Sequence, residues 1–237
     1  MSGELAKLQD EITGCRACPR LVEWRERVAR EKRAMFMGDE YWGKPVPGFG
    51  DPAAQIVVVG LAPAAHGANR TGRVFTGDRS GDWLFRSMHT TGLANQPTSE
   101  SRDDGLELTN AYVTAAVRCA PPANKPTPDE RDSCAHWLIS ELGLLPELRV
   151  AVVLGSFGYQ ALWTTLKAGG RALPTPRPKF GHGVEIDLPE GAASVMAPRL
   201  TRIVCSFHPS QQNTFTGRLT EPMLDGVFAR AVELTRR

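Results

Sequence analysis

The residues that decide the fold are Gly60–Trp83, GLAPAAHGANRTGRVFTGDRSGDW, together with the segments on either side of them. They follow the apolar run IVVV at 56–59 and precede a helix-like stretch that begins at Leu84. A continuous β-branched run is typical of a strand buried on both faces of a parallel sheet. The quoted stretch is therefore predicted to be a long loop at the carboxyl end of a strand, which is where ligands bind in open α/β sheets.

The composition of this loop favours an ordered, functional segment. Its glycines let the backbone approach a ligand closely, and Pro63, Phe75 and Trp83 are interleaved with its polar side chains. A long polar loop in a compact domain is usually either functional or disordered. A surface loop without a role is the alternative.

Strands and helices alternate along the rest of the chain. We predict strands at 56–60, 111–117, 150–154 and 202–206, and helices at 82–91, 129–142, 157–167 and 221–235. Ser156 is a candidate N-cap, and residues 184–188 are a candidate short strand in the Gly- and Pro-rich segment 168–200. This alternation predicts an α/β fold with a four-stranded parallel sheet and helices on both faces.

The bulk properties are those of an ordinary globular protein. The 237 residues, 41% hydrophobic and 23% charged, suit a single domain at 1–237 with an N-terminal extension at 1–50 that carries two helices, at 4–13 and 20–34. No membrane span and no secretory signal are visible, so a cytoplasmic location is expected. A net charge of +2 is weak evidence for a nucleic-acid partner.

The N-terminal segment has a local cluster of basic residues. Seven lie within 18 positions: Arg16, Arg20, Arg25, Arg27, Arg30, Lys32 and Arg33. Glu23, Glu26 and Glu31 alternate with them, as on the solvated face of a helix. A surface that faces phosphates is the competing interpretation.

Polar side chains follow three of the predicted strands. Asp78, Asn124 and His208 would meet at one edge of the sheet, because the carboxyl ends of parallel strands share that edge. An acid that activates water, an amide that reads a polar ligand and an imidazole that donates to negative charge suit catalysis. Taken singly, Asp78 could be a helix N-cap, Asn124 a turn residue and His208 structural.

The five cysteines fall into two groups: one predicted core residue and four candidate metal ligands. Cys205 lies in a β-branched strand and is predicted to be a buried apolar residue. Cys15 and Cys18 form a CxxC pair, and Cys119 and Cys134 lie about a hundred residues later. In an intracellular chain this set suits a Cys₄ metal site, either zinc or an iron–sulfur cluster, and the spacing does not choose between them.

Three long motifs resemble a known family. The segments GLAPAAHGANRTGRVFTGD, RCAPPANKPTP and HPSQQNTFTGRL, with CRACPRLVEWRE and PVPGFGD, are similar to the type-5 group of iron–sulfur uracil-DNA glycosylases. The resemblance implies a three-layer α/β/α sandwich. It also implies a [4Fe–4S] cluster on Cys15, Cys18, Cys119 and Cys134, and a monomer that acts on double-stranded DNA containing a damaged base.

The resemblance also implies roles for individual residues. Enzymes of this type flip the damaged nucleotide out of the duplex and hydrolyse the bond between base and sugar. Phe75 would stack on the base, His208 would hydrogen-bond it, and Asp78 would position water or stabilise the sugar. Asn124 would assist the water or the base, and the base would lie along Gly60, Leu61 and Ala62. On the DNA, Phe215 would act as a wedge and Arg218 would contact a phosphate.

Two positions depart from the related type-4 pattern. Leu61 stands where type-4 enzymes carry an acid, and Ala115 stands where they carry an asparagine that reads uracil. A pocket without that hydrogen-bonding group does not penalise other bases. We therefore expect a broader range that includes hypoxanthine. Two other functions compete: a non-catalytic nucleic-acid-binding module with a structural Cys₄ metal site, and a hydrolase of free nucleotides.

Overall fold

The computed structural model describes residues 3–189 and 196–236. Among them, the strands form one sheet in the order β1-β3-β2-β4-β6-β5. The four central strands are parallel, as predicted, and short antiparallel strands lie at both edges. The strands are β1 (Phe49–Gly50), β2 (Ile56–Gly60), β3 (Ala111–Ala115), β4 (Val150–Leu154), β5 (Glu185–Asp187) and β6 (Arg202–Ser206).

The sheet is thus wider than the four strands expected from the sequence. The edge strand β5 matches the candidate at 184–188, while β1 has only two residues and lies in a Gly- and Pro-rich segment without an alternating pattern. The predicted segment 168–200 also contains 190–195, which lie outside the described residues.

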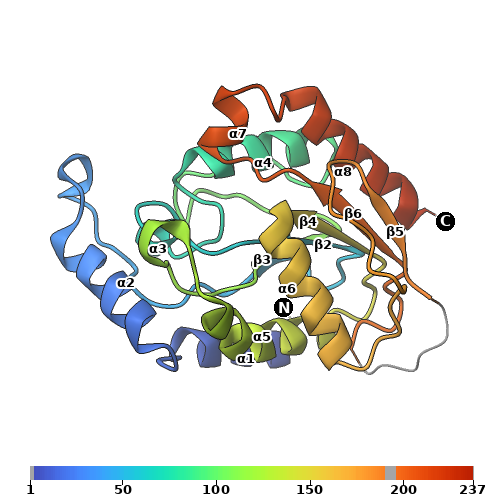
Figure 1. Ribbon diagram of the computed structural model, residues 1–237. Helices are drawn as coiled ribbons and strands as arrows, with labels where there is room; N and C mark the ends of the chain where they lie inside the picture. The colour runs from blue at the N-terminus through green and yellow to red at the C-terminus, as the bar shows by residue number, and fades with distance from the viewer. Residues whose placement is uncertain (1–2, 190–195, 237) are drawn as a thin grey trace.

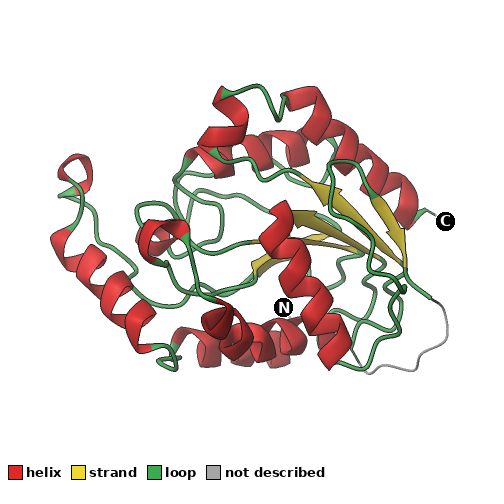
Figure 2. Ribbon diagram, viewed as in Figure 1, coloured by secondary structure: helices red, strands yellow, loops and turns green. Residues whose placement is uncertain are grey.

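Helices cover both faces of the sheet (Figures 1 and 2). One layer contains α4 and α8, and the other contains α1, α5 and α6. Alternate residues of β2 point into the two cores: Ile56 and Val58 toward α4 and α8, Val57 and Val59 toward α5 and α6. The helices are α1 (Gly3–Thr13), α2 (Pro19–Glu31), η1 (Ala34–Phe36), α3 (Ala68–Thr71), α4 (Arg79–Thr90), η2 (Pro122–Asn124), α5 (Pro128–Gly143), α6 (Gly155–Ala168), α7 (Gln211–Phe215) and α8 (Glu221–Thr235).

The predicted three-layer α/β/α arrangement is confirmed by these layers. Two short helices were not expected: α3 lies inside the long loop, and α7 follows the His208 segment. No described helix has the length and apolar character needed to cross a bilayer.

Helix starts follow local chemistry with one exception. Thr127 caps α5 in a capping box with Glu130, and Pro128 occupies the first turn. The prediction that Ser156 caps α6 is wrong. Gly155 has a φ of +85°, which turns the chain from β4 directly into the helix, so α6 starts at Gly155 and Ser156 lies within its first turn.

Candidate active site at the carboxyl edge of the sheet

Phe75 and His208 face each other at the carboxyl edge of the sheet. Their ring centroids are 5.9 Å apart and the rings are inclined by 34°. Phe75 has a φ of +53°, a conformation that costs free energy in a bulky residue and is often found at functional sites. A Cβ at Gly60 would lie 2.6 Å from the Phe75 ring, so only glycine at the end of β2 permits this placement.

The His208 imidazole is half-buried and has no hydrogen-bond partner among the residues that the structure describes. Its backbone carbonyl accepts a bond from Asn213 Nδ2 at 2.8 Å, which fixes the turn between β6 and α7. Burial lowers the pKa of His208 to about 4. The ring is therefore neutral near pH 7, and one of its nitrogens carries a hydrogen that can be donated to a ligand.

Asp78 is the N-cap of α4. Its Oδ1 accepts bonds from the amides of Ser80, at 2.9 Å, and Gly81, at 3.1 Å. Its Oδ2 accepts no bond from the described part of the chain and lies against Gly67, where a Cβ would be only 2.0 Å away. Burial raises the pKa of Asp78, while these two amides oppose the rise. Asp78 is thus a helix N-cap, which was the structural alternative for this residue, and its Oδ2 accepts no bond from a described residue.

Three other predicted residues lie along the same edge. Leu61 accepts a backbone bond from Val117 at 3.0 Å, and Ala62 packs against the small apolar cluster that contains Cys119. Asn124 is exposed on η2 with a φ of +54°, which is the backbone of a turn asparagine. No hydrogen bond joins its side chain to another described residue, so its role stays a prediction.

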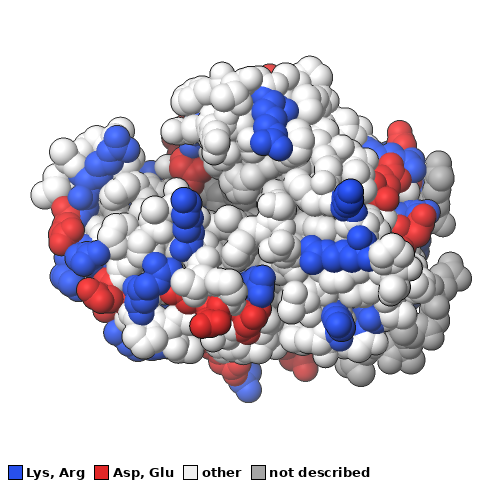
Figure 3. Space-filling model, viewed as in Figure 1, with Lys and Arg blue, Asp and Glu red and all other residues white. Residues whose placement is uncertain are grey.

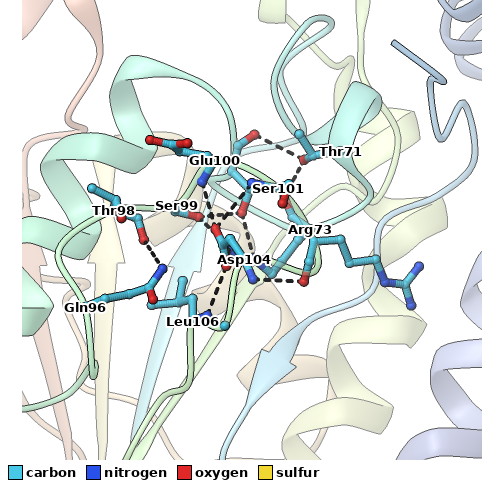
Figure 4. A network of polar contacts seen from close by, with 12 residues as sticks. Thr71, Arg73, Gln96, Thr98, Ser99, Glu100, Ser101, Asp104 and Leu106 are labelled. Atoms are coloured by element: carbon cyan, nitrogen blue, oxygen red, sulfur yellow. Dashed lines mark hydrogen bonds and ion pairs between the residues drawn. The ribbon is translucent and has the colours of Figure 1, made fainter.

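A buried network holds the loop that carries Phe75 (Figure 4). Arg73 Nη2 contacts both carboxylate oxygens of Asp104, at 2.9 and 2.7 Å, and its Nε donates to Thr76 Oγ1 at 2.9 Å. Ser99 bonds both Thr76 and Arg73. The Arg73 guanidinium and backbone amides hold the pKa of Asp104 at about 2, against the opposing effect of burial. Sequence reasoning missed this network, because nothing in SESRDDG (99–105) indicates which acid pairs with Arg73.

Removing Arg73 should be strongly destabilising. Arg73→Ala leaves Asp104 as a largely buried carboxylate without its cation, which typically costs about 3–5 kcal/mol. We expect the free energy of unfolding, measured by denaturant titration, to fall by a large part of that amount. Arg199→Ala, which breaks the exposed pair with Glu147, is the matched control and should cost less than about 1 kcal/mol. Equal losses in the two variants would contradict a structural role for the network.

The α7 turn presents an exposed aromatic ring beside Asp78. Phe215 is 67% exposed, and the guanidinium of Arg79, the residue after Asp78, lies 4.5 Å above its ring. Arg218 stacks in the same way on Phe207, at 4.5 Å. An aromatic side chain outside the core is consistent with the predicted wedge, and the roles of Phe215 and Arg218 stay predictions.

The four predicted cluster cysteines line one small, mostly apolar cavity between α2, α5 and the segment after β3. Burial raises the pKa of Cys119 to about 11 and that of Cys134 to about 12. Within the described residues, no three His, Cys, Asp or Glu side chains are grouped as they would be around a single metal ion. Cys205, by contrast, is buried inside β6, as predicted.

Hydrogen-bond donors surround this cavity. Arg25 donates to Cys119 Sγ at 2.8 Å, and the Arg118 amide donates to Cys134 Sγ at 3.4 Å. The buried Trp137 Nε1 has no partner among the residues described. The Arg118 side chain forms a fully buried pair with Glu141 at 2.7 Å. Donors directed at sulfur in an apolar setting suit a thiolate-bound metal group.

Positive side chains are spread around the face shown in Figure 3. Lys and Arg residues lie on several sides of a recess beneath the lobe that carries α7. The residues of the predicted basic N-terminal cluster have different surroundings. Arg16, Arg20 and Arg27 pair with glutamates, whereas Arg30 and Arg33 form no ion pair with a described residue.

Comparison with known proteins identifies the family. A model of the uracil DNA glycosylase superfamily matches residues 47–231. A type-5 uracil-DNA glycosylase of Thermus thermophilus is 51% identical over 223 residues, 94% of each chain. One from Mycobacterium tuberculosis is 49% identical over 234 residues, 98% of this chain and 82% of the relative. This chain belongs to the type-5 uracil-DNA glycosylases.

The family resemblance expected from the motifs is thereby confirmed. A type-4 uracil-DNA glycosylase of Pyrobaculum aerophilum is only 28% identical, over 160 residues, 67% of this chain and 64% of the relative. Of the two positions that depart from the type-4 pattern, Ala115 is buried at the end of β3 and lies opposite Gly60 in the β2–β3 register. In a type-5 glycosylase this position thus adjoins the Phe75 ring that packs on Gly60.

Proposed function

We propose that this protein is a monofunctional uracil-DNA glycosylase that removes uracil from duplex DNA and leaves an abasic site. One observation carries the proposal: the His208 imidazole, which has no hydrogen-bond partner among the described residues, faces the Phe75 ring at the carboxyl edge of the sheet. The loop that holds Phe75 continues into Asp78, whose Oδ2 accepts no bond from a described residue. The type-5 names of its relatives agree with it. We also propose that it acts in the cytoplasm and as a monomer.

The proposed mechanism distributes charge between two groups. A flipped base stacks on Phe75, and cleavage leaves negative charge on the base and positive charge on the sugar. The neutral His208 donates its N–H to the base carbonyl, which stabilises the leaving group. The Asp78 carboxylate, through Oδ2, orients the attacking water or stabilises the sugar. Asn124 assists the water or the base, and Gly60, Leu61 and Ala62 form the wall along the base.

Phe215 and Arg218 hold the DNA in this proposal. Phe215 fills the gap left by the flipped base, and Arg218 contacts a phosphate. The exposure of the Phe215 ring and its position over Arg79, next to Asp78, support this assignment.

We further propose that Cys15, Cys18, Cys119 and Cys134 hold a [4Fe–4S] cluster. The shared apolar cavity and the donors directed at two of the sulfurs support this. The thiolate ligands of a four-iron cluster lie farther apart than the ligands of a single metal ion. The described residues contain no group of three ligands placed for a single ion, which is compatible with such a cluster. The cluster would supply a covalent tie between the N-terminal segment and the segment after β3, and no redox step is required of it.

A broad substrate range is part of the proposal. Ala115 offers no hydrogen bond to the base edge, so a base other than uracil leaves no polar group unpaired there. We therefore include hypoxanthine among the substrates.

Ala115→Asn should narrow this range. The amide adds a polar group that must find a partner on the base, and the larger purine ring of hypoxanthine presents its N–H and carbonyl from a different position than uracil does. We therefore expect release of hypoxanthine to fall about tenfold or more relative to uracil. The measurement is the single-turnover rate on two duplexes that differ only in the target base. Ala115→Val controls for added bulk and should slow both reactions to a similar degree. An unchanged ratio in Ala115→Asn would contradict the assignment.

The overall proposal is tested with duplexes that contain uracil, hypoxanthine or neither, read by alkaline cleavage at the abasic site. Release of both bases is the expected result. Tight binding without release would favour the binding module, and activity on free nucleotides without dependence on duplex length would favour the nucleotide hydrolase.

A further inference from the structure

Exposed large apolar side chains occur in two places among the described residues. One is Phe215 on α7. The other is the turn that follows α2, where Met35 is 68% and Met37 is 60% exposed. We define residues 32–38 as the α2 tip. In Figure 1 this tip stands at the left of the molecule, well separated from α7 at the top. No role in the proposed chemistry accounts for two exposed methionines.

The α2 tip is held in a defined conformation. Its backbone forms the turn η1, with bonds from Phe36 N to Arg33 O at 2.7 Å and from Asp39 N to Phe36 O at 3.1 Å. Lys32 Nζ donates to Met37 O at 3.3 Å. A surface that is already ordered loses little conformational entropy when it binds a partner.

Arg70 joins the tip to the loop that carries Asp78. Its guanidinium lies 4.0 Å above the Phe36 ring and pairs with Asp39 at 2.7 Å. The same side chain donates to the carbonyls of His66, at 2.9 Å, and Gly77, at 3.1 Å. The Gly77 carbonyl belongs to the residue before Asp78.

The two exposed apolar sites are therefore each linked to a chain neighbour of Asp78. The α2 tip reaches Gly77 through Arg70, and Phe215 contacts Arg79. A long ligand that touches both sites would span the candidate active site. Double-stranded DNA, the substrate in the proposed function, is long enough to do so.

Charge favours DNA over a protein partner at the tip. Arg30, in the last turn of α2, and Arg33, in the tip, both precede the methionines in the chain and form no ion pair with a described residue, and Lys32 lies between the two arginines. The Asp39 carboxylate, which directly follows the tip, pairs with Arg70. Unpaired cations beside an exposed apolar pair match a phosphate backbone with sugars and base edges behind it.

We propose that the α2 tip is a second DNA contact, in which Arg30 and Arg33 bind phosphates and Met35 and Met37 pack against the sugars or bases of the duplex. This inference rests on the proposed function for the identity of the ligand. The contact holds the duplex at a place on the molecule that is separate from α7.

The test measures the affinity of intact holoprotein for a duplex that contains one stable abasic-site analogue, by fluorescence anisotropy at several salt concentrations. We expect Met35→Ser/Met37→Ser to weaken binding about tenfold. Met35→Leu/Met37→Leu, which keeps apolar bulk, should bind like the wild type. Arg30→Ala/Arg33→Ala should flatten the slope of log affinity against log salt by about 2, roughly one per lost phosphate contact.

Controls separate this inference from the proposed function. Lys167→Ala removes an exposed cation at the other end of α6 from Gly155 and should leave affinity and slope unchanged. Thermal melts of every variant check folding. If Met35→Ser/Met37→Ser binds the duplex with unchanged affinity, the inference is overturned. The same unchanged affinity is expected if the tip binds a protein instead of DNA. Failure of the wild type to release uracil in a parallel assay overturns the proposed function, and the affinity comparison still decides the role of the tip.

Discussion

Asp78→Asn should abolish most base release while leaving the fold intact. Asparagine caps helices as well as aspartate does, so its Oδ1 can keep the bonds to the Ser80 and Gly81 amides. The negative charge at Oδ2 is lost, and with it the group that would orient water or stabilise the sugar. General-base groups contribute about 10²–10⁴-fold. We expect the single-turnover rate on a uracil duplex to fall at least about a hundredfold, with the melting temperature nearly unchanged.

Asp78→Ala is the matched variant that separates capping from catalysis. It removes both oxygens, so it should lose the same activity and in addition about 1 kcal/mol of stability from the missing cap. For a chain of this size that is a fall of roughly 2–4 °C in melting temperature. If Asp78→Asn kept full activity, Asp78 would be a helix cap and nothing more.

His208→Ala should slow base release by a comparable factor, because it removes the hydrogen-bond donor to the departing base. Removing one donor to a developing anion costs about 10²–10³ in rate, and no residue that the structure describes competes for the hydrogen of the neutral His208 ring. We expect that loss in the single-turnover rate, and His208→Gln, which keeps an N–H donor, should recover part of it. Equal rates for His208→Ala and the wild type would remove His208 from the mechanism.

The pKa of His208 determines how its contributions to stability and to base release depend on pH. With a pKa of about 4, the folded protein keeps this ring neutral while the unfolded chain takes up a proton near pH 6.5. The contribution to stability is therefore fully present above pH 6.5 and is lost as the pH falls toward 4. The base-release profile should accordingly show no titration of His208 between pH 6.5 and 8.

The sequence predicted the parts of the fold that depend on local pattern. The four predicted central strands are present and parallel, and parallel strands bring the loops at their carboxyl ends to one edge of the sheet. Phe75 and His208 became neighbours for that reason. The edge strand β1 was missed because two residues carry no periodicity, and α6 begins two residues earlier than predicted because Gly155 turns the chain.

Long-range contacts were beyond the sequence. The pairing of Arg73 with Asp104 and the link from Arg70 to Gly77 join residues 7 to 31 positions apart whose partners depend on loop paths. Asp78 illustrates the same limit in another way. Its pattern fitted both a helix cap and a catalytic acid, and the structure gives one oxygen to the cap and leaves the other free.

The most direct test compares the wild type and Asp78→Asn on one uracil-containing duplex, with free uracil measured by chromatography and the strand examined before and after alkali. The wild type should release uracil and leave a strand that is cut only after alkali, whereas Asp78→Asn should bind the duplex with similar affinity and release uracil about a hundredfold more slowly. No release by the wild type, or equal release by the two proteins, would contradict a catalytic site at this edge of the sheet.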